Sequence, residues 1–195
     1  MHAKPVRVAA ALVSIASLLG GISAAHADPP KKCTKGYARE LGDLQITMDA
    51  TVATWEGIKA SAAASITDMR TAIANPEQSV SVISLENGAI VTAQAMRTSL
   101  ATERERNLKE MKAFKVRYSR CFTGKERTRF DSGAKLARAG FVEMATAKEH
   151  ILGVWGRLQF ADVTGADEYL TKTQVDVIAA EPTFDQGIRK LSTLK

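Results

Sequence analysis

Histidine and cysteine are scarce in this chain of 195 residues, which contains three histidines and two cysteines. Two of the histidines, His2 and His26, lie in an N-terminal stretch that we expect to be removed, so His150 is the only one left. One histidine cannot build a His-rich zinc site, no C-x-x-C-H pattern for haem attachment is present, and a Ser-His-Asp triad is disfavoured. The sequence therefore predicts neither a metal site nor a cofactor.

Other chemistry-bearing patterns are missing as well. No acidic residue stands out on the apolar helix faces described below, whereas an acid–base enzyme needs paired carboxylates in a cleft. Haem ligation by His150 and Met96, as in small periplasmic four-helix cytochromes, is disfavoured because His150 lies two positions past Lys148 and so turns away from the apolar face. We therefore expect a protein that is not an enzyme.

Long apolar runs are absent except for a short one near the N-terminus. Lys4 and Arg7 precede the mostly apolar residues 8–22, and Ala25-His26-Ala27 is a small-x-small cleavage site. These three parts make a secretory signal peptide, whereas an uncleaved membrane anchor would need a longer apolar run. We expect residues 1–27 to be removed, and residues 28–195 to form one domain, without a transmembrane anchor, that is exported to the periplasm or secreted.

The two cysteines, Cys33 and Cys121, both belong to the mature chain. Export delivers them to an oxidising compartment, and no C-x-x-C motif points to a redox role. We predict a disulfide bond between them. Closing a loop of this length would stabilise the fold by about 4–5 kcal/mol in the chain-entropy model.

Apolar residues recur at steps of three and four along most of the mature chain, which is the pattern of long amphipathic helices. The first helix is expected from Tyr37 to Asn75-Pro76, because the residue before a proline leaves the helical region. A second is expected from about residue 89 to residue 122 and a third from about 125 to 159, with Thr123-Gly124 as the turn between them. Together they predict three long helices.

Small residues mark one face of the third helix. Gly133, Ala137 and Gly140 lie close together on that face. Their small side chains would allow another helix to approach closely, although glycine also weakens a helix.

Two other segments are harder to interpret. Residues 76–88 combine a capping box that starts at Asn75 with a polar–apolar alternation that ends at the turn signal Asn87-Gly88, and we expect a short helix or an irregular connection rather than a hairpin. Beyond residue 159, Glu181-Pro182 is expected to break a helix that begins near Thr164. A capping box, Thr183-Phe-Asp-Gln186, then predicts a last short helix.

The fold that follows is an all-α, elongated antiparallel bundle of three long helices plus one or two short C-terminal helices, tied by one disulfide. Short connections make consecutive helices antiparallel. The first helix then begins where the second ends, so Cys33 and Cys121 are expected to meet. The helix periodicity predicts this independently of the cysteines.

Positive charge is concentrated at this cysteine-containing end. Over residues 28–43 and 109–129 there are twelve basic and five acidic residues. We predict that this basic pole binds a protein partner in the cell envelope or an anionic surface, whereas nucleic acid is not expected for an exported protein of modest charge. The alternative is a solvated helix end. The candidate binding residues are Lys31, Lys32, Lys35, Lys112, Lys115, Arg117, Arg120, Lys125, Arg127 and Arg129.

Two charged residues, Arg104 and Lys148, fall on otherwise apolar faces. Arg104 is expected at the height of Trp55, where a polar layer with a cation–π contact would fix the register of the bundle. We favour the other interpretation, in which the side chain extends to solvent from the edge of that face.

One short segment, Leu170-Thr-Lys-Thr-Gln174, resembles the LTxxQ motif of small periplasmic helical chaperones, and Phe122-Thr-Gly-Lys-Glu126 is a looser match. That resemblance implies binding of unfolded clients on an apolar, basic concave surface. We expect an exported, non-enzymatic binding or structural protein that acts through protein–protein contacts, as a component of an envelope assembly. A periplasmic chaperone-like holdase is the first alternative, and a small helical enzyme or ligand-binding bundle is the second.

Overall fold

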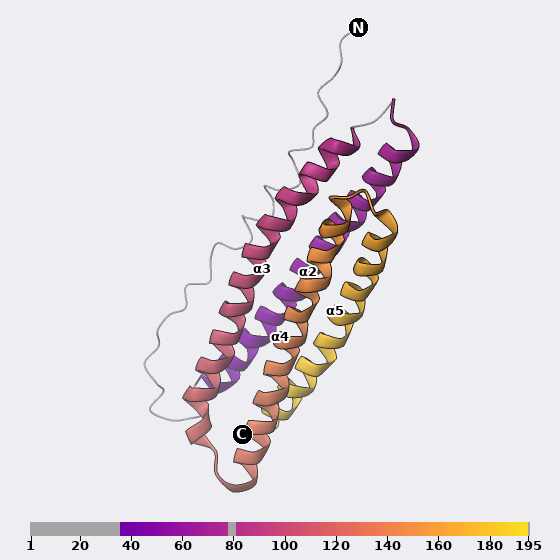
Figure 1. The fold of residues 1–195 in the computed structure, drawn as a ribbon. Coiled ribbons are helices and arrows are strands. Elements are labelled where there is room, and N and C mark those ends of the chain that lie inside the picture. The colour runs from indigo at the N-terminus through magenta and orange to yellow at the C-terminus, as the bar shows by residue number, and fades with distance from the viewer. Residues whose placement is uncertain (1–35, 78–80, 195) are drawn as a thin grey trace. The chain divides into compact units, whose positions relative to one another are not determined.

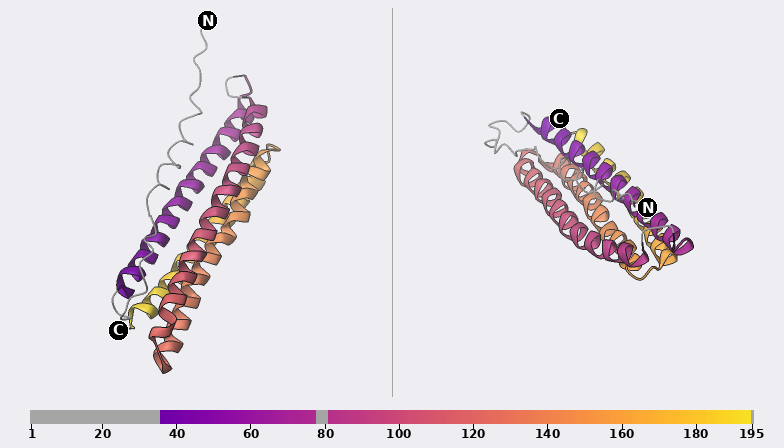
Figure 2. Two further views of the ribbon diagram at one scale, coloured as in Figure 1. Left: turned by 90° about the vertical axis from the view of Figure 1, so that its left-hand side faces the viewer. Right: turned by 90° about the horizontal axis from the view of Figure 1, so that it is seen from above.

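The computed structural model describes residues 36–77 and 81–194, which fold into four long antiparallel helices packed as a bundle (Figure 1). The helices are α2 (Tyr37–Ala74), α3 (Val82–Tyr118), α4 (Gly124–Leu158) and α5 (Val163–Ser192). A short 3₁₀ helix, η2 (Ser119–Cys121), follows α3. Each helix packs against the next along the chain, and α5 packs against α2, so the four helices surround one core (Figure 2). The predicted signal peptide lies outside the described residues.

The bounds of α2 agree with the prediction, and the start of this helix depends on a glycine. Gly36 precedes α2 with a φ of 107°, in the left-handed region that favours glycine. A Cβ atom at Gly36 would also lie 3.3 Å from the Tyr118 hydroxyl. The next residue, Tyr37, donates a hydrogen bond to the Leu191 carbonyl oxygen at 3.0 Å and so ties the start of α2 to the end of α5.

The start of α3 differs from the prediction. The helix begins at Val82 rather than near residue 89, because Ser81 caps it by accepting a hydrogen bond from the Ser84 amide at 3.2 Å. Asn87-Gly88, which is a turn signal in the sequence, lies inside α3. A glycine within a helix costs only about 1 kcal/mol, less than the cap and the apolar contacts provide. The connection between α2 and α3 is therefore shorter than the predicted segment 76–88, and no strand occurs in its described residues.

The C-terminal region contradicts the prediction of one or two short helices. Residues 163–192 form a single helix, α5, with Pro182 inside it. Thr183, expected as a helix cap, instead donates a hydrogen bond back to the Ala179 carbonyl at 3.1 Å, as threonines do within a helix. A proline in a helix interior costs about 3 kcal/mol, which the burial of Phe184 and Leu191 offsets on the far side of it. The bundle therefore has four long helices, not three.

The prediction of a close approach to α4 is confirmed, and the partner is α5. A Cβ atom at Gly187 would lie 2.3 Å from the Ala137 amide nitrogen and 2.7 Å from the Gly133 carbonyl oxygen. One at Gly140 would lie 2.6 Å from the Phe184 Cβ atom. The backbones of α4 and α5 thus touch where these glycines face each other, which makes this the tightest helix pair of the bundle.

Cys121, the single cysteine among the described residues, lies half-buried in η2 at the end of α3. Its predicted partner, Cys33, lies outside the described residues. The disulfide bond therefore stays a prediction.

Candidate functional site

An aromatic cluster forms the base of the candidate site, where α2 begins, α3 ends and α4 begins. Tyr37, Phe114, Tyr118, Phe122 and Phe130 are all buried, and neighbouring ring centroids lie 5.0–6.0 Å apart. Burial raises the pKa of Tyr118 to about 12 and raises that of Tyr37 further, so both hydroxyls stay neutral at physiological pH. The cluster gives this end of the bundle a rigid core.

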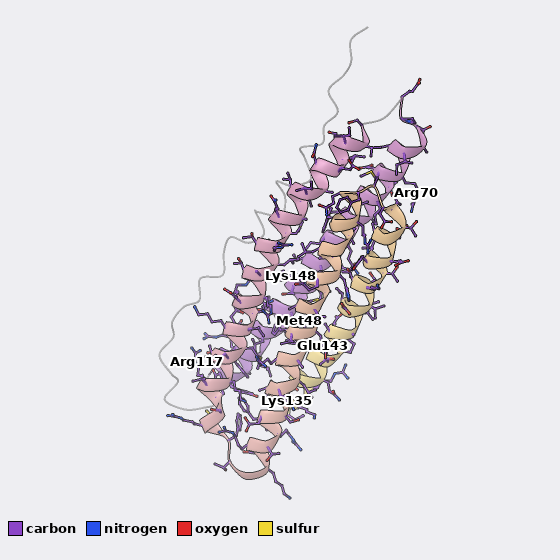
Figure 3. All side chains as sticks on the ribbon, viewed as in Figure 1. Met48, Arg70, Arg117, Lys135, Glu143 and Lys148 are labelled. Carbon is purple, nitrogen blue, oxygen red and sulfur yellow. The ribbon has the colours of Figure 1, made fainter. Side chains whose placement is uncertain are left out.

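Some of the predicted binding residues instead hold the helices together. Arg117 pairs with Glu40 of α2, and this hydrogen-bonded contact raises the Arg117 pKa. Arg127 Nε lies 2.8 Å from Asp131 Oδ2, and Lys115 Nζ lies 3.8 Å from Asp131 Oδ1. Figure 3 labels Arg117 at this end of the bundle, with Lys148 much farther along. These three cations are therefore partly committed to the fold.

Other cations of the predicted pole remain available to a partner. Lys112, Arg120 and Lys125 are exposed and form no ion pair with a described residue. Arg129 donates a hydrogen bond to the Thr193 hydroxyl at 3.5 Å. Lys31, Lys32 and Lys35 lie outside the described residues.

The structure also enlarges the basic pole, because α5 returns to it. The bundle divides into two parts along its length. The smaller part, which we call the basic half, consists of residues 36–48, 107–138 and 185–194 and holds thirteen basic and six acidic residues. The described remainder, which we call the acidic half, holds eight basic and fourteen acidic residues. The basic residues of the basic half are Arg39, Lys109, Lys112, Lys115, Arg117, Arg120, Lys125, Arg127, Arg129, Lys135, Arg138, Arg189 and Lys190.

A shallow apolar groove of about 300 Å³ opens in the basic half, between the start of α2 and the end of α5. The groove was not predicted, because a helix break at Pro182 would separate residues 188–194 from the rest of α5. The lining residues are Tyr37, Ala38, Leu41, Gly42, Gln45, Ile188, Ser192 and Leu194.

A polar layer crosses the core between α2 and α3. Asn107 Nδ2 donates to Thr51 Oγ1 at 3.0 Å, and Thr47 Oγ1 donates to Glu110 Oε2 at 3.2 Å. Burial raises the pKa of the nearby Glu103, against the opposing effects of Arg106 and of a hydrogen bond with Thr51.

The predicted polar positions lie at the edge of this layer. Arg104, Lys148 and Trp55 line a cleft of about 20 Å³ beside Asn107, whose Oδ1 atom is buried without a hydrogen-bond partner. No cation–π contact joins Arg104 to Trp55 in the part of the chain that the structure covers. Arg104 is exposed, as the alternative interpretation expected.

His150 and the chaperone-like segment both have structural contacts. His150 Nδ1 lies 2.6 Å from Asp176 Oδ2 and so links α4 to α5. Gln174 lies inside α5 and accepts a hydrogen bond from the buried Lys59 at 2.5 Å. Within residues 36–77 and 81–194, no cluster of three or more His, Cys, Asp or Glu side chains is placed to hold a metal ion.

Comparison with known proteins finds no significant match to this chain. Neither a protein-family model, nor a curated protein, nor a solved structure matches the chain significantly. None of the helices in the described residues has a stretch apolar and long enough to cross a bilayer.

Proposed function

We propose that this chain is an exported, non-enzymatic binding or structural protein of the cell envelope, which acts through protein–protein contacts made by its basic half. The observation that carries this proposal is the set of exposed cations that form no ion pair with a described residue, Lys112, Arg120 and Lys125. These residues lie at the end of the bundle whose core is the aromatic cluster. The backbone that holds these charges therefore loses little conformational freedom when a partner binds.

Two further features support an envelope assembly. The signal-peptide pattern of residues 1–27 directs the chain out of the cytoplasm, and a Cys33–Cys121 bond would fix the N-terminal lysines beside the exposed cations. The charge difference between the two halves favours an acidic protein surface as the partner and increases the rate of encounter with it.

A chaperone-like holdase is the second candidate, and exposed apolar side chains favour it. Ile83, Val91, Phe160, Val175 and Ile178 each have more than half of their surface accessible to solvent. Client proteins are held through such side chains. A purified holdase would suppress the aggregation of an unrelated unfolded protein, and an absence of suppression would eliminate this candidate.

The leading proposal is tested by affinity capture from envelope extracts. Substituting Lys112 and Lys125 by Glu should abolish capture of a stoichiometric partner and leave the fold intact, because neither side chain has an ion pair to lose among residues 36–77 and 81–194. Arg97→Glu with Arg106→Glu is the matched control, since it makes the same change of charge on exposed residues of the acidic half. Capture that survives the first pair of substitutions would refute the role of the basic half.

A further inference from the structure

The turn between α4 and α5 presents a large apolar side chain to solvent. Phe160 is 74% exposed. The next residue, Ala161, has a φ of 54°, in the left-handed region that non-glycine residues rarely adopt. Asp162 fixes the turn, since its carboxylate accepts a hydrogen bond from the Gly165 amide at 2.9 Å and lies 3.3 Å from Arg157. The fold thus holds Phe160 outward by a strained but well-anchored turn, and a phenylalanine held in this way is suited to enter a pocket.

A matching recess lies at the other end of α5. The groove between α2 and α5, with Leu41 and Ile188 in its lining, has a volume of about 300 Å³. That is enough for one aromatic side chain and part of its neighbours. Because α5 has 30 residues, the turn and the groove lie about 45 Å apart, and one copy cannot bring them together (Figure 1).

The two halves that contain these features carry net charges of opposite sign. Exposed Arg39 and Arg189 are next in sequence to groove residues, whereas exposed Glu168 and Glu77 belong to the acidic half, which contains the turn. The two halves carry net charges of +7 and −6 over the described residues, counting His150 as neutral. Two copies placed end to end therefore bring unlike charges together, whereas two like halves repel each other.

We propose that the partner of the basic half is a second copy of this chain, whose Phe160 turn docks into the groove between α2 and α5. This inference rests on the proposed function, that the basic half is a protein-binding surface, and names its partner. The contact is heterologous, since different surfaces of the two copies meet. A pair of copies keeps one free groove and one free turn, so the association extends into open chains unless it closes into a ring.

Sedimentation velocity of the full mature protein at low and high salt tests the proposal. The sedimentation coefficient should rise with protein concentration at low salt and fall back toward the monomer value at high salt, because exposed charge pairs are screened. Phe160→Ser should weaken the association at least tenfold. Ile178→Ser is the matched control, since it removes another exposed apolar side chain, 59% accessible, from the middle of α5 and should change nothing.

Charge reversal gives the sharpest form of the test. Arg39→Glu with Arg189→Glu should abolish association, and so should Glu77→Lys with Glu168→Lys. The chain with all four substitutions should associate again, because the two pairs of reversed residues have exchanged signs. A failure of the four-fold variant to recover, with both pairs still folded by circular dichroism, would overturn the charge-paired contact.

The outcome separates this inference from the proposed function. A wild-type protein that stays monomeric at every concentration and salt overturns self-association, and it points to another occupant of the groove, such as residues 28–35 of the same chain. If that monomer still loses an envelope partner when Lys112 and Lys125 are reversed, the basic half remains a binding surface for a different protein.

Discussion

The close contact between α4 and α5 makes a quantitative prediction about two glycines. Substituting Gly187 by Ala places a Cβ atom 2.3 Å from the Ala137 amide nitrogen and 2.7 Å from the Gly133 carbonyl oxygen. Both are backbone atoms, so no side chain can move aside to make room. The helices must separate by roughly 1 Å to restore ordinary van der Waals distances, and contacts along the rest of the interface would loosen.

The magnitude follows from two opposing effects. Alanine gains about 0.5–1 kcal/mol over glycine in a helix interior, whereas overpacking a well-filled interface costs about 1–3 kcal/mol or more. With backbone atoms as the obstruction we expect the upper part of that range, and a net loss of about 2 kcal/mol in the free energy of unfolding. For a chain of this size such a loss lowers Tm by about 4–8 °C.

Gly57→Ala is the matched control, because nothing lies within 4 Å of a Cβ atom at this exposed position of α2. The same chemical change should there raise the free energy of unfolding by about 0.5–1 kcal/mol. Urea denaturation of both variants, with thermal unfolding followed by circular dichroism, measures the difference. Equal stabilisation by both substitutions would refute the close packing of α4 on α5.

Three further perturbations test the electrostatics and the covalent tie. Burial raises the Glu103 pKa, so the folded state favours the protonated form: the resulting stability is present at acidic pH and is lost as the pH rises through the raised pKa. Glu103→Gln should therefore stabilise the protein at pH 7 relative to wild type and have a smaller effect near pH 4, which urea titrations at the two pH values would reveal. A double-mutant cycle on Glu40 and Arg117 should give a coupling of about 1–2 kcal/mol, and a value near zero would show that this partly buried pair does not hold α2 to α3. Reductant should lower Tm if Cys33 and Cys121 are joined, and an unchanged Tm would count against the bond.

Helix periodicity in the sequence was sufficient to predict most of this fold. The steps of three and four placed α2 within two residues of its observed bounds, because one face of that helix is buried along its whole length. The same reasoning identified Gly133, Ala137 and Gly140 as a face for close approach. It could not name the partner helix, since helical periodicity says which face is buried and not what covers it.

The errors came from strong local signals that tertiary contacts overrode. Pro182 looks like a helix end, yet Phe184 and Leu191 beyond it are fully buried and keep α5 continuous. Asn87-Gly88 looks like a hairpin turn, yet the cap at Ser81 starts α3 upstream of it.

Only part of the candidate site could be predicted, because it depends on contacts between distant segments of the chain. Charge counting along the chain found the basic pole, but only the arrangement in space distinguishes Arg117, which pairs with Glu40, from the exposed Lys112. The apolar groove depends on Ile188 of α5 lying beside Leu41 of α2. These residues are far apart in sequence, and no local pattern connects them.

The central claim is that the basic half contacts a protein partner in the envelope, and site-specific photo-crosslinking in living cells tests it most directly. A photoreactive residue in place of Lys112 should yield a discrete crosslinked product, whereas the same residue in place of Arg97, which is exposed on the same helix in the acidic half, should not yield that product. A product identified as a second copy of this chain would support the docking of like subunits, and a different protein would identify another partner. No product from position 112, with a normal amount of folded protein in the envelope, would contradict the account.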